Sequence, residues 1–267
     1  MRSNRELFSL EGRVAVLTGG AGHLALALAT GLIEQGARVV LGDREAGAGA
    51  ARAAELCRQA GREAATFRAV DLLDEAATRA FVAQAAATWG RLDILIHNAA
   101  YTGGTAAPGW AEPFERQTLD AWDEAMRVNL GSAFVLAQAA APWLVASPGP
   151  SVLLVSSIYG LVGPQWDLYE GTGMVNPAAY GASKGGLLQL ARYLATTLAP
   201  IRVNCLSPGG IRRGQPQAFQ ERYAARTPLK RLATEEDCKG AAVFLASDAS
   251  AYLTGQNIVV DGGWTCW

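Results

Sequence analysis

Two side chains able to exchange protons stand four positions apart, Tyr180 and Lys184 in the segment AAYGASKGG. Positions i and i+4 lie on one face of a helix, about one turn apart, and this segment has the pattern of a helix start. A phenol has a pKa of about 10 in water and must lose about two to three units to act near neutrality. A neighbouring ammonium supplies part of that shift. The pair predicts an acid–base site; the alternative is a chance pair on an exposed helix face.

Two further segments could add polar groups to this site. Ser156 and Ser157 follow the apolar run 151–155, so their hydroxyls would lie at the carboxyl edge of a sheet. We expect Ser157 to hydrogen-bond a substrate oxygen. Asn129, in the RVNLG segment of another helix, would hold a water molecule or kink that helix. Each residue alone is more often a turn or packing residue, but together they form a site hypothesis.

A glycine-rich turn, TGGAG at 18–22, follows the apolar run 14–18 and precedes a segment rich in Ala and Leu. This order of strand, turn and helix suits a dinucleotide, because its pyrophosphate needs backbone N–H donors at a helix N-terminus and little side-chain bulk. Such a turn is also often only a tight connection between two elements. Both interpretations stay open at this point.

Asp43 closes the second predicted strand, about 20 residues beyond the turn, where an acidic side chain can accept both ribose hydroxyls of a dinucleotide. Its carboxylate would repel a 2′-phosphate, which favours NAD over NADP. Arg44 beside it could soften that repulsion and admit NADP. A surface aspartate without such a role is the other alternative.

Strands and helices alternate along the chain and must position these residues. The predicted strands are 14–18, 37–42, 67–70, 92–97, 151–155, 201–206 and 257–260, and the predicted helices include 24–35, 46–60 and 75–89. This alternation predicts an α/β fold of the Rossmann class, a doubly wound parallel sheet with helices on both faces and ligands at the carboxyl ends of its strands. No low-complexity linker divides the chain, so we expect residues 1–267 to form a single domain.

Composition limits the possible partners and cofactors. The 267 residues are 50% hydrophobic and 18% charged, with a formal net charge of −1, so the chain can bury a sizeable core. No basic cluster predicts a nucleic-acid or membrane partner, and no apolar leader or spanning segment is present, so we expect a soluble cytoplasmic protein. Four scattered cysteines and two histidines indicate neither a disulfide framework nor a metal site.

With these motifs in view, the sequence resembles the short-chain dehydrogenase/reductase family over nearly its whole length. Seven family signatures occur in the family's order: TGGAGHLA at 18–25, Asp43, Asp71-Leu72, His97-Asn98-Ala99-Ala100, the tetrad Asn129, Ser157, Tyr180 and Lys184, then Ser207-Pro208-Gly209 and Asp261-Gly262-Gly263.

The resemblance implies a mechanism and a homotetramer. Tyr180 would exchange a proton with the substrate oxygen while hydride moves between carbon and nicotinamide. Lys184 would bind the nicotinamide ribose and lower the pKa of the tyrosine, and Asn129 would help to relay the proton outward. The cofactor-binding residues implied are Gly19, Gly22, His23, Leu24, Asp43, Asp71, Leu72, Asn98, Ala99, Tyr180, Lys184, Pro208, Gly209 and Ile211.

The chain departs from the family pattern at four positions. His23 and Ala25 replace two turn glycines, and Ala100 replaces the last glycine of the strand-end motif. The ring of His23 would point to solvent, weaken cofactor binding or hydrogen-bond a phosphate. Arg213 stands where the family has a threonine, which puts one contact to the carboxamide end of the cofactor in doubt.

The segment from about 160 to 177, between Ser157 and Tyr180, is longer than the family usually has and should lie over the substrate pocket. Trp166, Tyr169 and Glu170 offer the stacking faces and acceptors that sugars and polyols use. A self-packed lid or a subunit contact is the alternative. The insertion resembles a branch of the family linked to sugar metabolism and to surface-sugar modification of the flagellin type.

Arg212 and Arg213 begin the family's mobile substrate loop, here about 210–227, where two guanidinium groups could bind a carboxylate or phosphate. An anionic sugar derivative or sugar acid would fit them; two solvated arginines are the alternative. The aromatic C-terminal segment 263–267 could pack into the pocket of a neighbouring subunit.

Three functions are compatible with these observations. The leading hypothesis is an NAD-dependent oxidoreductase that interconverts a secondary alcohol and a ketone on a polar, sugar-like or sugar-acid substrate. An NADPH-dependent carbonyl reductase is the second, with Asp43 as counter-evidence. A non-catalytic nucleotide-binding homologue is the third, suggested by the altered glycines, but the intact tetrad speaks against it.

Overall fold

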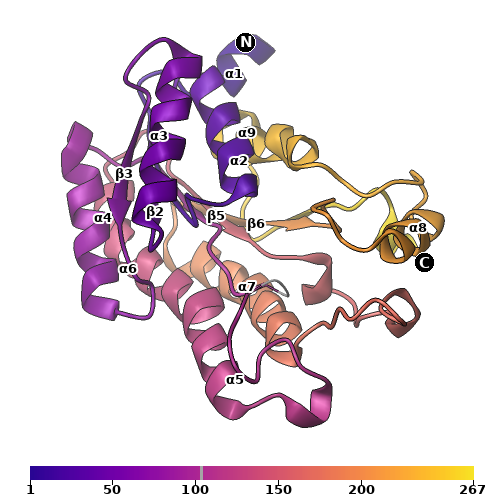
Figure 1. Cartoon of the computed structure of the whole chain (residues 1–267). Coiled ribbons are helices and arrows are strands. Elements are labelled where there is room, and N and C mark those ends of the chain that lie inside the picture. Colours follow the sequence, from indigo (N-terminus) through magenta and orange to yellow (C-terminus); the bar gives the residue numbers. More distant parts are fainter. Residues whose placement is uncertain (103–104) are drawn as a thin grey trace.

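Seven parallel strands form one sheet at the centre of the computed structural model, which describes residues 1–102 and 105–267 (Figure 1). The strands are β1 (Val14–Thr18), β2 (Arg38–Asp43), β3 (Ala65–Ala69), β4 (Ile94–His97), β5 (Ser151–Val155), β6 (Arg202–Pro208) and β7 (Asn257–Val260). Their order in space is β3-β2-β1-β4-β5-β6-β7. The order reverses between β1 and β4, and an open α/β sheet binds its ligands at the carboxyl ends beside such a reversal.

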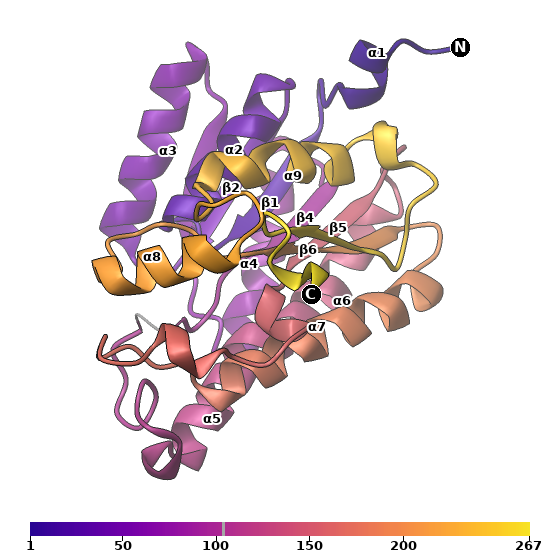
Figure 2. The same ribbon diagram turned by 90° about the vertical axis from the view of Figure 1, so that its right-hand side faces the viewer.

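Helices cover both faces of the sheet (Figures 1 and 2). One face carries α2 (His23–Glu34), α3 (Ala46–Ala60) and α9 (Lys239–Ala246), and the other carries α4 (Glu75–Trp89), α6 (Ser132–Leu144) and α7 (Ala178–Thr197). The remaining α-helices of the described residues are α1 (Asn4–Phe8), α5 (Leu119–Met126) and α8 (Gln217–Arg226). The predicted doubly wound parallel sheet is confirmed.

Continuous apolar runs form the central strands because both of their faces are buried. All five residues of β1, VAVLT, are buried, and so are all five of β5, SVLLV. Their side chains divide between two hydrophobic cores, one on each side of the sheet. Burial of one such aliphatic side chain contributes about 1.5 to 3 kcal/mol, so the cores hold the strand ends in fixed positions.

Capping residues set the bounds of α3 and α4. Asp74 caps α4 by accepting a hydrogen bond from the backbone N–H of Ala77 at 2.9 Å. Gly61 and Gly90 end α3 and α4 in the left-handed region, with φ of 63° and 73°, which glycine adopts without steric cost. The bounds of both helices therefore coincide with those predicted from the sequence.

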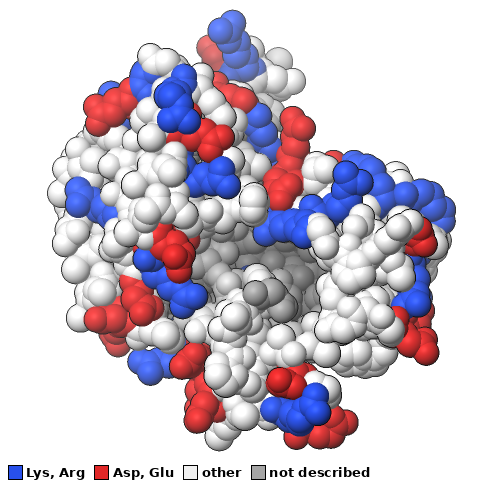
Figure 3. All heavy atoms as spheres, viewed as in Figure 1, with Lys and Arg blue, Asp and Glu red and all other residues white. Residues whose placement is uncertain are grey.

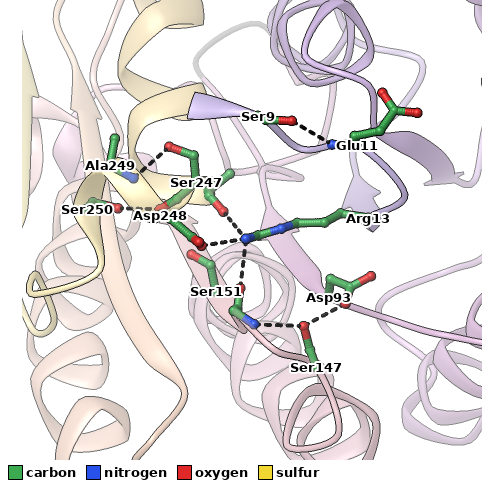
Figure 4. Close-up of polar contacts among 12 residues, drawn as sticks. Ser9, Glu11, Arg13, Asp93, Ser147, Ser151, Ser247, Asp248, Ala249 and Ser250 are labelled. Atoms are coloured by element: carbon green, nitrogen blue, oxygen red, sulfur yellow. Dashed lines mark hydrogen bonds and ion pairs between the residues drawn. The ribbon is translucent and has the colours of Figure 1, made fainter. Parts of the chain in front are cut away.

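Polar contacts close the amino ends of the strands (Figure 4). Arg13, just before β1, donates to the carbonyl of Gly149 at 3.0 Å and forms an ion pair with Asp248. The hydroxyl of Ser147 donates to the carboxylate of Asp93, just before β4, at 2.6 Å. This edge of the sheet is thus occupied by structural contacts, and the opposite edge is left for a ligand.

A separate body of residues projects beyond the carboxyl ends of the strands, at the right of Figure 1. We call it the distal lobe: residues 158–177, the helix α8 and the short helix at Trp264–Cys266. It has a core of its own, which also includes Leu232 from outside these segments and is otherwise composed of Ile158, Leu168, Tyr169, Phe219, Tyr223 and Trp264. None of the helices in the described residues is both long and apolar enough to cross a membrane.

Candidate active site

A cleft of about 920 Å³ lies at the carboxyl ends of the central strands, between the sheet and the distal lobe. Figure 3 shows this face of the molecule hollowed between the two bodies. Every residue predicted to bind a cofactor lines the cleft, from Gly19 in the first turn to Ile211 after β6. The sheet therefore brings together residues that are far apart in the sequence.

The glycine-rich turn packs tightly against the end of β4. A Cβ on Gly19, whose φ is 71°, would lie 2.8 Å from Nδ2 of Asn98 and 2.9 Å from Cα of Ala99. The helix α2 begins after Gly22 with no side-chain cap, so its first N–H groups are available to an anionic group in the cleft. The donor set and the lack of side-chain bulk fit a pyrophosphate.

Two departures from the family pattern have simple structural outcomes. The side chain of His23 is exposed and lines the cleft, so it has room beside the glycine-rich turn. Ala25 is fully buried in the core between α2 and the sheet, which accommodates its methyl group.

Asp43 ends β2 at the cleft and ties the glycine-rich turn to that strand. One carboxylate oxygen accepts from the N–H of Ala21 at 3.0 Å, and the other accepts from the N–H of Glu45 at 3.1 Å. Each oxygen has a second lone pair, so the carboxylate can still accept ribose hydroxyls. Arg44 also lines the cleft, and its largely exposed side chain lies 3.6 Å from the carboxylate of Glu45.

The predicted acid–base residues lie together at the end of β5. Lys184 on α7 is buried and donates from Nζ to the carbonyl of Val155 at 2.7 Å. The same Nζ lies 5.7 Å from the ring centroid of Tyr180, so the two side chains share one face of the helix. Ser157 lines the cleft beside Tyr180.

The surroundings of these groups set their protonation. Burial raises the pKa of Tyr180, and its hydrogen bond with Ser157 and the guanidinium of Arg213 act in the opposite direction. Burial lowers the pKa of Lys184 to about 8. The phenol is therefore a neutral acid in this state, and further positive charge near it would be needed to stabilise a phenolate.

Asn129 lies behind the cleft, in a π-helical turn (Arg127–Gly131) between α5 and α6. Its Oδ1 accepts from the N–H of Tyr101 at 2.7 Å, and its Nδ2 donates to the hydroxyl of Ser183 at 3.0 Å. The π-turn is a departure from the regular helix at Asn129, and the role of this residue in holding a water molecule or kinking the helix stays a prediction. Single π-turns of this kind are frequent at functional sites.

Similar proteins place the chain in a family. A family model described as enoyl-(acyl carrier protein) reductase matches residues 20–265. The chain is 36% identical over 259 residues to cis-4-hydroxycyclohexanecarboxylate dehydrogenase of Sinomonas cyclohexanicum, covering 95% of this chain and 96% of the relative. It superimposes on a short-chain type dehydrogenase/reductase from Mycobacterium marinum with a TM-score of 0.85 and 28% identity over the whole of both chains. The chain belongs to the short-chain dehydrogenase/reductase family.

Other relatives of this short-chain dehydrogenase/reductase act on sugar acids. It is 33% identical to 2-dehydro-3-deoxy-D-gluconate 5-dehydrogenase of Pseudoalteromonas atlantica, covering 97% of this chain and 98% of the relative. A gluconate 5-dehydrogenase from Burkholderia cenocepacia, solved with NADP and tartrate, has a TM-score of 0.86 and 31% identity and covers 99% of this chain and 100% of its own. The predicted class, an NAD(P)-dependent oxidoreductase acting on CH–OH groups, is confirmed.

Three residues predicted to contact the substrate, Trp166, Glu170 and Arg212, are not part of the cleft wall in this structure, and a role for them in substrate binding stays a prediction. The short helix Trp166–Leu168 directs Leu168 and Tyr169 inward and leaves Trp166 57% exposed. Glu170 is exposed, and its carbonyl accepts from Nη1 of Arg222 on α8 at 2.5 Å. Arg212 is exposed.

Tyr169 and Arg213 do line the cleft of this short-chain dehydrogenase/reductase. The insertion also packs on itself and on α8 through Tyr169, so it is a self-packed cover as well as part of the cleft wall. In the same way Trp264 is buried in the distal lobe of its own chain, whereas Trp267 is exposed.

Sequence reasoning missed several residues of the cleft wall. Tyr159, Asn176, Phe219 and Tyr223 line the cleft on its lobe side. Tyr159 follows Ser157 by two residues, and the others lie in the two segments expected near the substrate, about 160–177 and 210–227. No local pattern shows which side chains of these segments face the cleft, because the packing of the insertion against α8 decides it.

Proposed function

We propose that this protein interconverts a secondary alcohol and a ketone with NAD(H), on a polar cyclic or sugar-like substrate that carries an acid group. The observation that supports it most directly is the convergence of Tyr180, Ser157, Lys184 and Arg213 on one cleft below the glycine-rich turn. The relatives that act on hydroxycyclohexanecarboxylates and on gluconate derivatives support this substrate class.

In this proposal the tyrosine moves the proton. The hydroxyl of Tyr180 exchanges a proton with the substrate oxygen, and Ser157 holds that oxygen by a hydrogen bond. Lys184 binds the ribose next to the nicotinamide and adds positive charge, which stabilises the phenolate. Asn129 stands at the start of the outward proton path. Bound NAD supplies the hydride acceptor.

The cofactor would lie along the carboxyl edge of the sheet. The N–H groups of the first turn of α2 would hold its pyrophosphate and Asp43 its adenosine ribose. Asp71 and Leu72 would contact the adenine, and Pro208 and Gly209 would flank the nicotinamide. The assignment to NAD rests on Asp43. Arg44 in the same cleft is the observation that favours the second candidate, an NADPH-dependent carbonyl reductase.

Arg213 is suited to bind the acid group. Its Nε lies 2.9 Å from the carboxylate of Glu235, which fixes the side chain, and no hydrogen bond of its two terminal nitrogens is found within the described residues. These nitrogens can bind a carboxylate with two parallel hydrogen bonds. Arg213 and Tyr180 line the same cleft, so the acid group would lie on the same side of the cofactor as the reacting carbon.

We expect Asp43→Ala to reduce the preference for NADH over NADPH by about 10-fold or more, because the repulsion of the 2′-phosphate is removed and a ribose contact is lost. Fluorescence titration of both cofactors against the wild type and the variant measures this preference. Asp123→Ala, an exposed carboxylate on α5, is the matched control. An unchanged preference places cofactor selection elsewhere, and binding of neither cofactor favours the non-catalytic homologue.

Tyr180→Phe removes only the phenolic oxygen and should lower turnover by about 10³-fold while NADH affinity stays nearly constant. The assay follows NADH formation from NAD with hydroxycyclohexanecarboxylates, aldonates and neutral cyclic alcohols as substrates. Retained turnover in the variant contradicts the proposed proton transfer.

The protein is further proposed to act as a homotetramer. Large apolar side chains are exposed on the outer helices, namely Leu119 and Trp122 on α5, Phe134 and Trp143 on α6 and Tyr193 on α7. Self-association would remove them from water. Sedimentation at micromolar concentration measures the assembly, and a monomer would contradict it.

A further inference from the structure

Two phenols share a hydrogen bond in the lobe side of the cleft. The hydroxyl oxygens of Tyr159 and Tyr169 are 2.5 Å apart, and Nδ2 of Asn176 donates to the oxygen of Tyr169 at 3.4 Å. Tyr159 lies in the short helix Ile158–Gly160 that follows β5, and Tyr169 comes from the insertion. The ring of Tyr159 lies edge-on to that of Tyr180, with ring centroids 6.5 Å apart. The pair is therefore adjacent to the proposed proton donor.

Whichever phenol of this pair donates to the other, one O–H donor is left without an acceptor among the described residues. A phenol has one O–H donor and can accept at its oxygen. If Tyr169 donates to Tyr159, the O–H of Tyr159 has no acceptor among the described residues. If Tyr159 donates instead, Tyr169 accepts from both Tyr159 and Asn176, and its own O–H is the one left over. Either arrangement leaves one donor, and a buried donor without a partner is costly.

The cleft is where that donor can find an acceptor. Both tyrosines line the cleft, and Tyr169 is only 9% exposed. Burial raises the pKa of both phenols, so they stay protonated at physiological pH. Phe219 packs against the ring of Tyr169 with centroids 5.4 Å apart. A charged ligand group would lose its hydration against this aromatic wall, whereas an uncharged oxygen would gain a hydrogen bond.

We propose that the hydroxyls of Tyr159 and Tyr169 form a neutral donor subsite that binds a second, uncharged oxygen of the substrate, one that does not react with Tyr180. This inference rests on the proposed function and narrows it to cyclic alcohols that carry another hydroxyl or ether oxygen. Arg213 would take the acid group, and the phenol pair would select the hydroxyl pattern of the ring.

The test compares two ring alcohols of similar size. With NAD, kcat/KM is measured for trans-1,4-cyclohexanediol and for trans-4-methylcyclohexanol, in which a methyl group replaces the second hydroxyl. General damage to the enzyme lowers both kcat/KM values alike, so their ratio reports the discrimination between the two alcohols. We expect the double variant Tyr159→Phe/Tyr169→Phe to lower the diol-to-methyl ratio by about 10-fold, mainly through KM. Each single variant should lower it less, because the remaining phenol keeps a proton to donate.

Tyr252→Phe is the matched control, since Tyr252 is fully exposed and remote in sequence from the cleft wall; it should keep the wild-type ratio. An unchanged ratio in the double variant overturns the subsite but leaves the proposed oxidoreductase function intact.

If the wild type oxidises neither alcohol, the choice of cyclic alcohols as substrates fails, and the subsite is tested by binding alone. Ligand-detected NMR then compares the affinity of both alcohols for the NADH complex of the wild type and of the double variant. Tighter binding of the diol that disappears in the double variant supports the subsite. Equal affinities in the wild type, or a preference that survives in the double variant, overturn it.

Discussion

At the scale of single residues, His97 is an ionisable ring in a fully buried position. Its Nε2 lies 2.8 Å from the hydroxyl of Ser132, and Nδ1 has no hydrogen-bond partner within the described part of the chain. Burial, together with the positive charge of Lys184, lowers its pKa from 6.5 to about 3. The imidazole is therefore neutral in the folded protein at any pH where the enzyme would work.

This depressed pKa makes the folded state sensitive to acid. Between pH 6.5 and about 3 the unfolded chain binds a proton at His97 that the folded chain does not, so stability falls as the pH falls through this range. At pH 5 the loss attributable to His97 is about 2 kcal/mol. We expect His97→Asn to remove this component, measured by urea unfolding at pH 7.5 and pH 5.0 at one protein concentration.

The test compares the loss of stability on acidification in the wild type with that in His97→Asn. The contributions of other acid-sensitive groups are common to both proteins and cancel. Asp93 is one such group. Burial raises the pKa of its carboxyl, but hydrogen bonds with Arg91 and Ser147 outweigh this effect and lower the pKa. Its contribution is the same in the wild type and in His97→Asn. The exposed His23 provides the control variant His23→Asn. An equal loss of stability on acidification in the wild type and His97→Asn would falsify the assignment.

At the scale of elements, the distal lobe depends on contacts between distant segments. The guanidinium of Arg222 on α8 donates to the carbonyls of Asp167 and Glu170, at 3.1 and 2.5 Å. The rings of Tyr169 and Phe219 meet below these bonds. The insertion is therefore held by α8 over the cleft.

Arg222→Ala should loosen the insertion, because two carbonyls lose a charged donor. The segment 160–177 contains no lysine or arginine but contains Trp166, Leu168 and Tyr169, so chymotrypsin is the suitable probe. We expect cleavage within this segment to become about 10-fold faster. Mass spectrometry of the fragments locates the cut, and Arg58→Ala on α3 is the control. An unchanged cleavage rate would mean that aromatic packing alone holds the insertion.

The sequence predicted the elements whose signals are local. The strands at 151–155 and 257–260 and the helices at 46–60 and 75–89 have the expected bounds, because buried apolar runs and capping residues set them. The strand predicted at 67–70 is found at 65–69, since pairing with β2 decides its register.

For the candidate site, motifs located the cofactor residues and the pair Tyr180 and Lys184. They could not locate its lobe side. A single helical turn at Trp166–Leu168 decides which side chains of the insertion face inward, and Phe219, which packs on the ring of Tyr169, comes from α8, some 50 residues further along the chain.

At the scale of the whole molecule, the end of the chain is connected to the part of the cleft wall that follows β6. Trp264 stacks on Tyr223 with ring centroids 4.5 Å apart, and the guanidinium of Arg226 lies 5.1 Å from the Trp264 ring. The hydroxyl of Tyr223 accepts from the N–H of Gly210 at 2.6 Å. The C-terminal turn therefore supports both α8 and the segment after β6.

Trp264→Ala should release α8 without disturbing the sheet. Loss of a buried indole costs about 3 kcal/mol or more, but the effect should be confined to the distal lobe because the other core clusters do not include Trp264. We expect amide hydrogen exchange of α8 to become about 100-fold faster, with exchange in β1 and β5 unchanged, as followed by mass spectrometry. Trp267→Ala, at a 71% exposed position, is the control. Faster exchange throughout the sheet would contradict a separable lobe.

The two chain ends have different practical value as points of attachment. The N-terminus lies beside α1, away from the cleft, whereas the C-terminus lies beside α8 (Figure 1). Cys266, an exposed thiol, lies two residues beyond the indole that supports α8. Immobilising the enzyme through its N-terminus would leave the distal lobe unconstrained. A support coupled to Cys266 would restrict movement of the lobe. A fluorophore on the same thiol would convert movement of α8 into an optical signal.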